Sequence, residues 1–172
     1  MPRKRRQDDP IPFGIAYAQS ETFRTMFRDG MRLVEETADY LDGEGRAAAR
    51  ALGRPASIVY ATESMRLTTR LMQLASWLLL HRAVKEGEMS LAQASKEKTK
   101  VRLTTADRGD ADSIALLPER LQDLIARSKK LQAEVLRLDA TIHAPVAVPQ
   151  AWNNPVERQL GLLKAAFEQG RV

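Results

Sequence analysis

The sequence of 172 residues contains no cysteine, few aromatic residues and no long hydrophobic run. Without cysteine there are no disulfides, thiolate nucleophiles or cysteine-bound zinc, which fits a reducing compartment. The longest apolar stretch, around Leu78–Leu80, is too short to cross a membrane. The basic N-terminus continues into polar residues and lacks the apolar core of a secretory signal. We therefore expect a cytoplasmic protein without membrane contact.

The chain also lacks a basic body, although its net charge is +5. Arg3, Lys4, Arg5 and Arg6 account for four of the 27 basic residues, so the rest carries 23 basic against 22 acidic residues. Phosphate binding needs lysine and arginine gathered on one face. The sequence therefore argues against nucleic acid as a partner and favours a disordered basic tail over residues 1–14.

No catalytic motif is present. His81 and His143 are far apart in sequence, and neither belongs to a Glu-x-x-His or His-x-x-x-His pair that would place metal ligands on one helix face. Phosphate-binding glycine loops and the Gly-x-Ser-x-Gly turn are also missing. Only a catalytic triad assembled from residues far apart in sequence would not be detected by these motifs. We predict no enzyme, no metal and no cofactor.

Apolar residues recur at helical spacing in three long segments, over about residues 20–41, 55–86 and 118–143. The third segment is the most regular, since its apolar positions continue over three heptads. The fold prediction is an all-α, antiparallel three-helix bundle of long helices over residues 15–143, with short accessory helices.

The remaining segments are weakly specified. Residues 46–52 read as either a short helix or a loop, residues 90–100 as a short helix opened by a capping box, and residues 98–112 as a loop. Residues 144–172 are predicted to form a flexible tail, with a proline-rich linker and a short amphipathic helix. The sequence leaves open whether this helix docks on its own bundle or on a partner. Its candidate partner-binding residues are Trp152, Leu160, Leu163 and Phe167.

The second long segment is apolar on two opposite sides. One stripe carries small and flexible residues, from Ile58 to Leu79, and the other is almost pure leucine. One neighbouring helix cannot cover both stripes, so the helix is either central in a bundle or reaches a second subunit. The candidate dimer interface consists of Leu67, Leu71, Leu74 and Leu78.

A polar strip separates the two stripes. It contains the candidate partner-binding residues Arg66, Arg70, Gln73 and Trp77. Arginine and tryptophan are frequent anchors of protein interfaces. The simpler interpretation, which we prefer, is that the strip is a solvated polar boundary between the two stripes, with Trp77 partly in the core.

Three stretches together resemble the RcdA family (regulator of CtrA degradation). They are residues 27–43, residues 60–79 and residues 119–138, of which the middle one, Tyr-Ala-Thr-Glu-Ser-Met-Arg-Leu-Thr-Thr-Arg-Leu, is the most specific. The resemblance implies a homodimeric three-helix bundle that serves as a proteolytic adaptor. It would bring cell-cycle regulators, its protein cargo, to the ClpXP protease together with a response-regulator-like priming factor. A structural or regulatory helical dimer, either DNA-associated or ligand-sensing, is the alternative.

Overall fold

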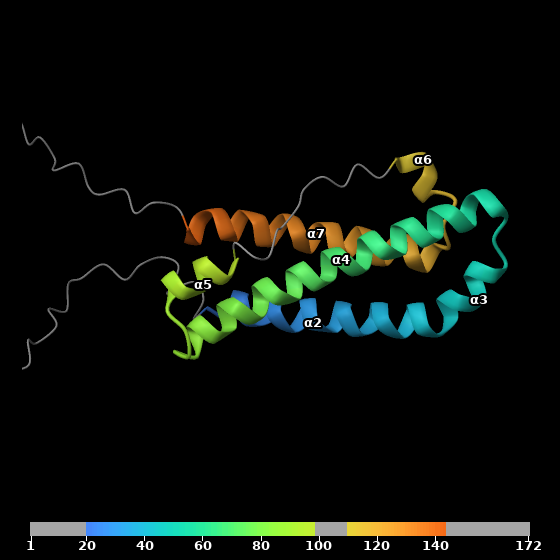
Figure 1. The fold of residues 1–172 in the computed structure, drawn as a ribbon. Coiled ribbons are helices and arrows are strands. Elements are labelled where there is room, and N and C mark those ends of the chain that lie inside the picture. Colours follow the sequence, from blue (N-terminus) through green and yellow to red (C-terminus); the bar gives the residue numbers. More distant parts are fainter. Residues whose placement is uncertain (1–19, 99–109, 144–172) are drawn as a thin grey trace, which may run out of the picture.

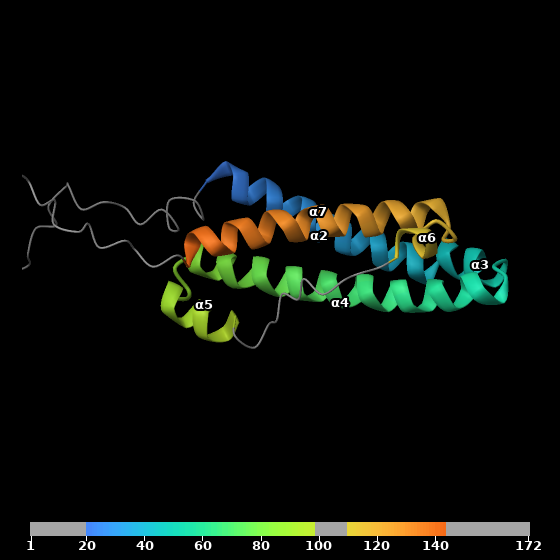
Figure 2. The same ribbon diagram turned by 90° about the horizontal axis from the view of Figure 1, so that it is seen from above.

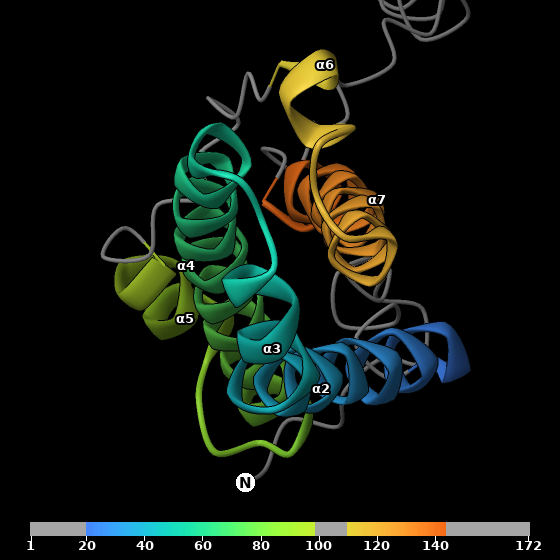
Figure 3. The ribbon, with the colours of Figure 1, turned by 90° about the vertical axis from the view of Figure 1, so that its right-hand side faces the viewer.

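The computed structural model describes residues 20–98 and 110–143, and over these ranges the chain forms six helices and no strand. Three of the helices are long, namely α2 (Glu21–Asp42), α4 (Arg54–Lys85) and α7 (Glu119–Ile142), and they lie side by side along the molecule (Figure 1). Viewed along the bundle, they occupy the corners of a triangle (Figure 3). The predicted all-α bundle of three long helices is confirmed.

The direction of one helix differs from the prediction. Helix α2 runs antiparallel to α4, but α7 runs parallel to α4 (Figure 1). Hydrogen bonds between the two helices agree, since Arg70 pairs with Ser128, and Trp77, further along α4, pairs with Asp139, further along α7. The chain between α4 and α7 therefore returns to the end of the bundle where α4 begins.

Local signals in the sequence explain where the helices begin. The Ser20 hydroxyl accepts a hydrogen bond from the Phe23 amide and caps α2. Pro55 lies in the first turn of α4, where its missing N–H is not needed. The predicted capping box is present at α5 (Leu91–Lys98), because Ser90 and Gln93 each donate a backbone N–H to the other's side chain.

The short helices lie at the two ends of the bundle. Helix α3 (Glu44–Arg50) follows α2 directly, which decides between the helix and loop predicted for residues 46–52. Helix α5 packs at the C-terminal end of α4, whereas α6 (Ala111–Ile114) lies near the start of α7 (Figure 2). The brief helix α6 begins inside the predicted loop of residues 98–112 and extends two residues beyond it. The predicted basic tail, most of the loop and the C-terminal tail fall outside the described residues.

The core lies between the three long helices and is mainly leucine. Gly30 of α2 permits a close approach of the helices, because a methyl group there would lie 2.7 Å from Leu78 Cδ1 and 3.3 Å from Leu131 Cδ2. The other buried apolar side chains of the long helices are Phe23, Leu33, Tyr40, Leu67, Leu71, Leu74, Trp77, Leu121, Leu124, Ile125, Val135, Leu138 and Ile142.

A charge cluster joins α2 to α7 at the bundle surface. Glu36 accepts hydrogen bonds from both Arg127 Nη atoms, at 2.6 and 3.2 Å, and from Arg120 at 3.3 Å. The hydrogen bond from Arg127 is the main reason why the pKa of Glu36 lies below its ordinary value. This cluster fixes the position of α7 relative to α2.

Candidate protein-binding surface

One face of α4 exposes a row of large apolar side chains. Ile58, Met65, Met72 and Leu79 follow one another at intervals of seven residues, and their exposed fractions are 62, 72, 67 and 51%. Such residues are scattered on ordinary protein surfaces, whereas a continuous apolar stripe marks an interaction site. We call these four residues, with Thr62, Thr69 and Ser76 between them, the α4 stripe.

Two of the three polar residues of the α4 stripe have their hydroxyl groups paired within the helix. The Thr62 hydroxyl donates to the Ile58 carbonyl at 3.0 Å, and the Ser76 hydroxyl donates to the Met72 carbonyl at 2.8 Å. Because these hydroxyls are paired within their own helix, an apolar partner can cover them without leaving a donor unsatisfied. The stripe has the three-and-four spacing of a coiled-coil seam and extends over about 30 Å.

A pocket of about 320 Å³ adjoins the middle of the stripe, between α2 and α4. Met72 belongs to both the pocket and the stripe, and most of the other lining residues are apolar or small. They are Val34, Thr37, Ala38, Leu41, Asp42, Thr68, Leu71 and Ala75. A side chain from a protein bound on the stripe would find an apolar recess here.

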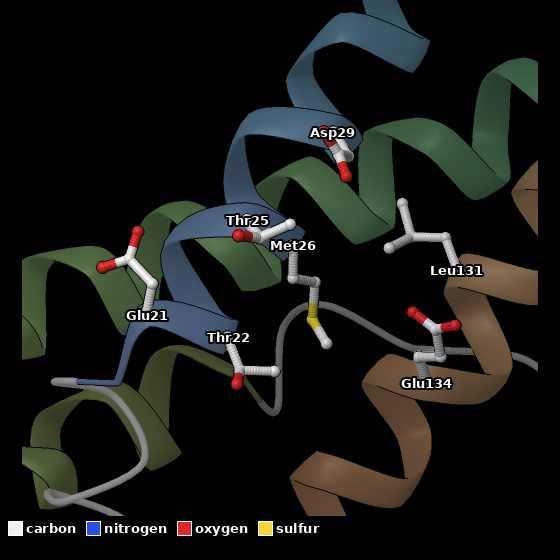
Figure 4. Close-up of a pocket in the computed structure, with 7 residues that line it drawn as sticks. All are labelled: Glu21, Thr22, Thr25, Met26, Asp29, Leu131 and Glu134. Carbon is white, nitrogen blue, oxygen red and sulfur yellow. The ribbon is translucent and has the colours of Figure 1, made fainter.

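A second pocket, of about 400 Å³, lies between α2 and α7 (Figure 4). Met26 and Leu131 point into the space between the two helices, and the carboxylates of Glu21, Asp29 and Glu134 surround it. Arg24 and Arg32 form ion pairs with Glu21 and Asp29, respectively. The negative charge is thus partly compensated within α2.

A buried polar cluster links the C-terminal ends of α4 and α7. Trp77 Nε1 donates to Asp139 Oδ1 at 2.8 Å, and the Trp77 and His81 rings stack with their centroids 3.9 Å apart. The His81 and His143 rings are 5.6 Å apart, so two histidines separated by 62 positions meet in space. Burial is the main cause that lowers the pKa of both histidines, and the Lys98 ammonium adds to it.

Comparison with known proteins identifies the family. Residues 15–167 match the profile of a family described as a protein of unknown function, DUF1465. The crystal structure of RcdA from Caulobacter crescentus CB15 matches with 46% sequence identity and a TM-score of 0.62. That match covers 76% of this chain and 98% of the RcdA chain. This chain belongs to the RcdA family. No curated protein matches it at a significant level.

In this RcdA-family chain, the four leucines predicted to form a dimer interface are not accessible to a partner. Leu67, Leu71, Leu74 and Leu78 have exposed fractions of only 0 to 4% and pack in the core of a single chain. A second copy cannot reach them while the bundle is folded. The opposite face, with Ile58, Met65, Met72 and Leu79, is the one left uncovered.

The polar strip is also mostly internal. Arg70 and Trp77 are buried, Gln73 is half-buried, and only Arg66 is largely accessible. The Arg70 guanidinium donates to the Ser128 hydroxyl at 2.8 Å, and Arg66 pairs with the buried Glu63 at 2.6 Å. These arginines therefore interact within the bundle. The four candidate residues of the tail, from Trp152 to Phe167, lie outside the described residues.

None of the helices over residues 20–98 and 110–143 is long and apolar enough to cross a membrane.

The residue types of the α4 stripe indicate its exposure, although the sequence analysis did not assign the stripe to the surface. Two of its four large residues are the flexible methionines Met65 and Met72, with threonine and serine between the large residues, whereas four leucines line the buried face. Branched leucines with defined rotamers suit a core, and methionine is frequent at binding surfaces.

Proposed function

We propose that this RcdA-family chain is a non-enzymatic adaptor that delivers cell-cycle regulatory proteins to the ClpXP protease in the cytoplasm. The observation that carries the proposal is the match to RcdA, with which this chain shares 46% sequence identity over 98% of the RcdA chain. An adaptor needs separate surfaces for its partners, and it acts by raising the local concentration of cargo near the protease.

We further propose that the α4 stripe holds a second copy in a homodimer. In a two-fold symmetric interface each residue faces its counterpart by the same rule. An antiparallel pairing centred between Met65 and Met72 would place Met65 opposite Met72 of the second copy and Ile58 opposite Leu79. Large residues then meet along the whole stripe, and the small residues between them allow a close approach.

The adaptor role is tested by degradation assays with purified ClpXP and its priming factor. A cell-cycle regulator captured by this chain should be degraded severalfold faster when the chain is added. A cargo that ClpXP degrades without help is the control, and its rate should stay unchanged. The double substitution Leu160→Glu and Leu163→Glu, in the full-length chain, tests whether the predicted C-terminal helix contacts cargo.

Two results would contradict the adaptor role. One is a degradation rate that is the same with and without this chain for every captured regulator. The other is an equal acceleration of the control cargo, since that would indicate activation of the protease itself. In the first case a structural or regulatory dimer takes the place of the adaptor.

A further inference from the structure

Three potential metal ligands converge in the polar cluster at the C-terminal ends of α4 and α7. His81, Asp139 and His143 each offer one ligand atom, and these atoms all lie within 4.8 Å of one another. Asp139 lies in the last turn of α7, and His143, four positions later, is the C-cap residue of the same helix. His81 approaches from α4 and is 1% exposed.

The hydrogen bonds of the two histidines involve the same nitrogen, Nδ1, in each ring. His81 Nδ1 lies 3.0 Å from the Trp77 carbonyl oxygen, which only accepts, so Nδ1 carries the proton and Nε2 has a lone pair. His143 Nδ1 lies 2.9 Å from the Ser95 hydroxyl. Both Nε2 atoms are buried without a hydrogen-bond partner. Metal-binding histidines have this arrangement, in which one ring nitrogen is held by a neighbour and the other binds the ion.

Asp139 supplies the third ligand from its Oδ1 atom. That oxygen is 3.6 Å from His143 Nε2 and also accepts the Trp77 indole hydrogen bond, which orients the carboxylate. The other oxygen, Oδ2, pairs with the Lys98 ammonium at 2.5 Å. The Lys98 side chain is 27% exposed. Its flexible stem can move the charge away from an incoming cation.

We propose that His81, Asp139 and His143 form a binding site for a divalent transition-metal ion, with Zn²⁺ as the preferred ion. Two imidazole nitrogens and one carboxylate oxygen are a common three-ligand set for zinc, with water as the fourth ligand. The ion would bind the Nε2 atoms of both histidines and connect α4 to α7. Helix α5, which carries Ser95, would be held to the same site.

Zn²⁺ binding to the full-length chain, with any polyhistidine tag removed, tests the site. Titration calorimetry should give one Zn²⁺ per chain, and saturating Zn²⁺ should raise the melting temperature by about 5 °C or more. Zn²⁺ has no visible spectrum, so Co²⁺ serves as the probe of coordination. Co²⁺ should give the intense visible bands of a four-coordinate ion, and Zn²⁺ should abolish them.

Substitutions assign the binding to these residues. His143→Gln and Asp139→Asn, each checked for native helix content without metal, should weaken Zn²⁺ binding by at least about tenfold and remove the Co²⁺ bands. Lys98→Met should tighten binding severalfold, because it removes a neighbouring positive charge, whereas Lys130→Met on the exposed side of α7 should change nothing. Absence of the Co²⁺ bands in the native chain would overturn the proposal. So would equal Zn²⁺ affinity in the native chain and in both ligand variants.

Discussion

Gly45 shows how a single hydrogen atom in place of a side chain shapes the bundle end. A methyl group at this position would lie 2.7 Å from the Tyr40 carbonyl oxygen and 2.6 Å from the Tyr60 hydroxyl. The carbonyl belongs to the backbone of α2 and cannot move aside as a side chain can. Glycine therefore permits α3 to turn directly against the end of α2.

We expect Gly45→Ala to destabilise the fold by about 1 kcal/mol. Alanine gains about 1 kcal/mol of helix propensity over glycine, but overpacking costs about 1–3 kcal/mol. Chemical denaturation measures the net effect. Ala47→Gly, at an exposed position of the same helix, is the matched control and should lose about 1 kcal/mol from propensity alone. A Gly45→Ala chain more stable than the native one by the full propensity gain of about 1 kcal/mol would contradict the close packing.

At the scale of elements, the contact between α2 and α7 depends on charge as well as packing. The pKa of Glu36 is lowered from 4.5 in the folded chain, mainly by its hydrogen bond from Arg127. A carboxyl group with a lowered folded-state pKa stabilises the fold fully above its unfolded-state pKa. That contribution disappears as the pH falls through the folded-state value.

We therefore expect Glu36→Gln to cost about 0.5–1 kcal/mol near neutral pH, the range for a partly exposed ion pair. The difference from the native chain should shrink below about pH 4.5 and vanish in stronger acid, where Glu36 is itself protonated. Urea unfolding over a pH series measures both effects. Glu35→Gln removes the same charge from an exposed neighbouring position, and it should show neither.

Helix α4 shows how far the sequence could predict the structure. Its two apolar stripes followed from spacing alone, as did the limits of α2, α4 and α7 to within a residue or two. Spacing did not decide which stripe faces inward, because either one can pack against a neighbour. Nor did it reveal that Arg70 is buried, which depends on the small Ser128 residue across the interface with α7.

Two substitutions with the same chemistry separate the core from the surface. Leu74→Ala should destabilise the fold by about 3 kcal/mol, because Leu74 is 1% exposed and its loss leaves a cavity. Leu116→Ala, at a residue 52% exposed, should change stability by less than about 0.5 kcal/mol. Denaturation midpoints compare the two directly. Similar losses in both variants would place Leu74 outside the core.

At the scale of the whole molecule, the parallel course of α4 and α7 could not be read from the sequence. Each helix pattern is independent of its direction, and the connection over residues 86–118 is long enough for either arrangement. The same arrangement creates the histidine cluster, since it places the C-terminal ends of α4 and α7 together. An antiparallel α7 would have separated His81 from His143 by the length of the bundle.

The exposed α4 stripe also predicts the oligomeric state of the molecule. A bundle that leaves four large apolar residues uncovered along one helix gains free energy when two copies cover them. Light scattering coupled to size exclusion should therefore give about twice the chain mass of 19.3 kDa at micromolar concentration.

Met72→Glu should shift the chain to the monomer, because an unpaired charge buried in the interface costs several kcal/mol. Its helix content should stay unchanged, since Met72 is exposed in the single chain. Leu116→Glu places the same charge on a leucine outside the stripe that is 52% exposed, and it should leave the dimer intact. A monomeric native chain would rule out the homodimer, and a dimer that survives Met72→Glu but not Leu116→Glu would move the interface to the start of α7.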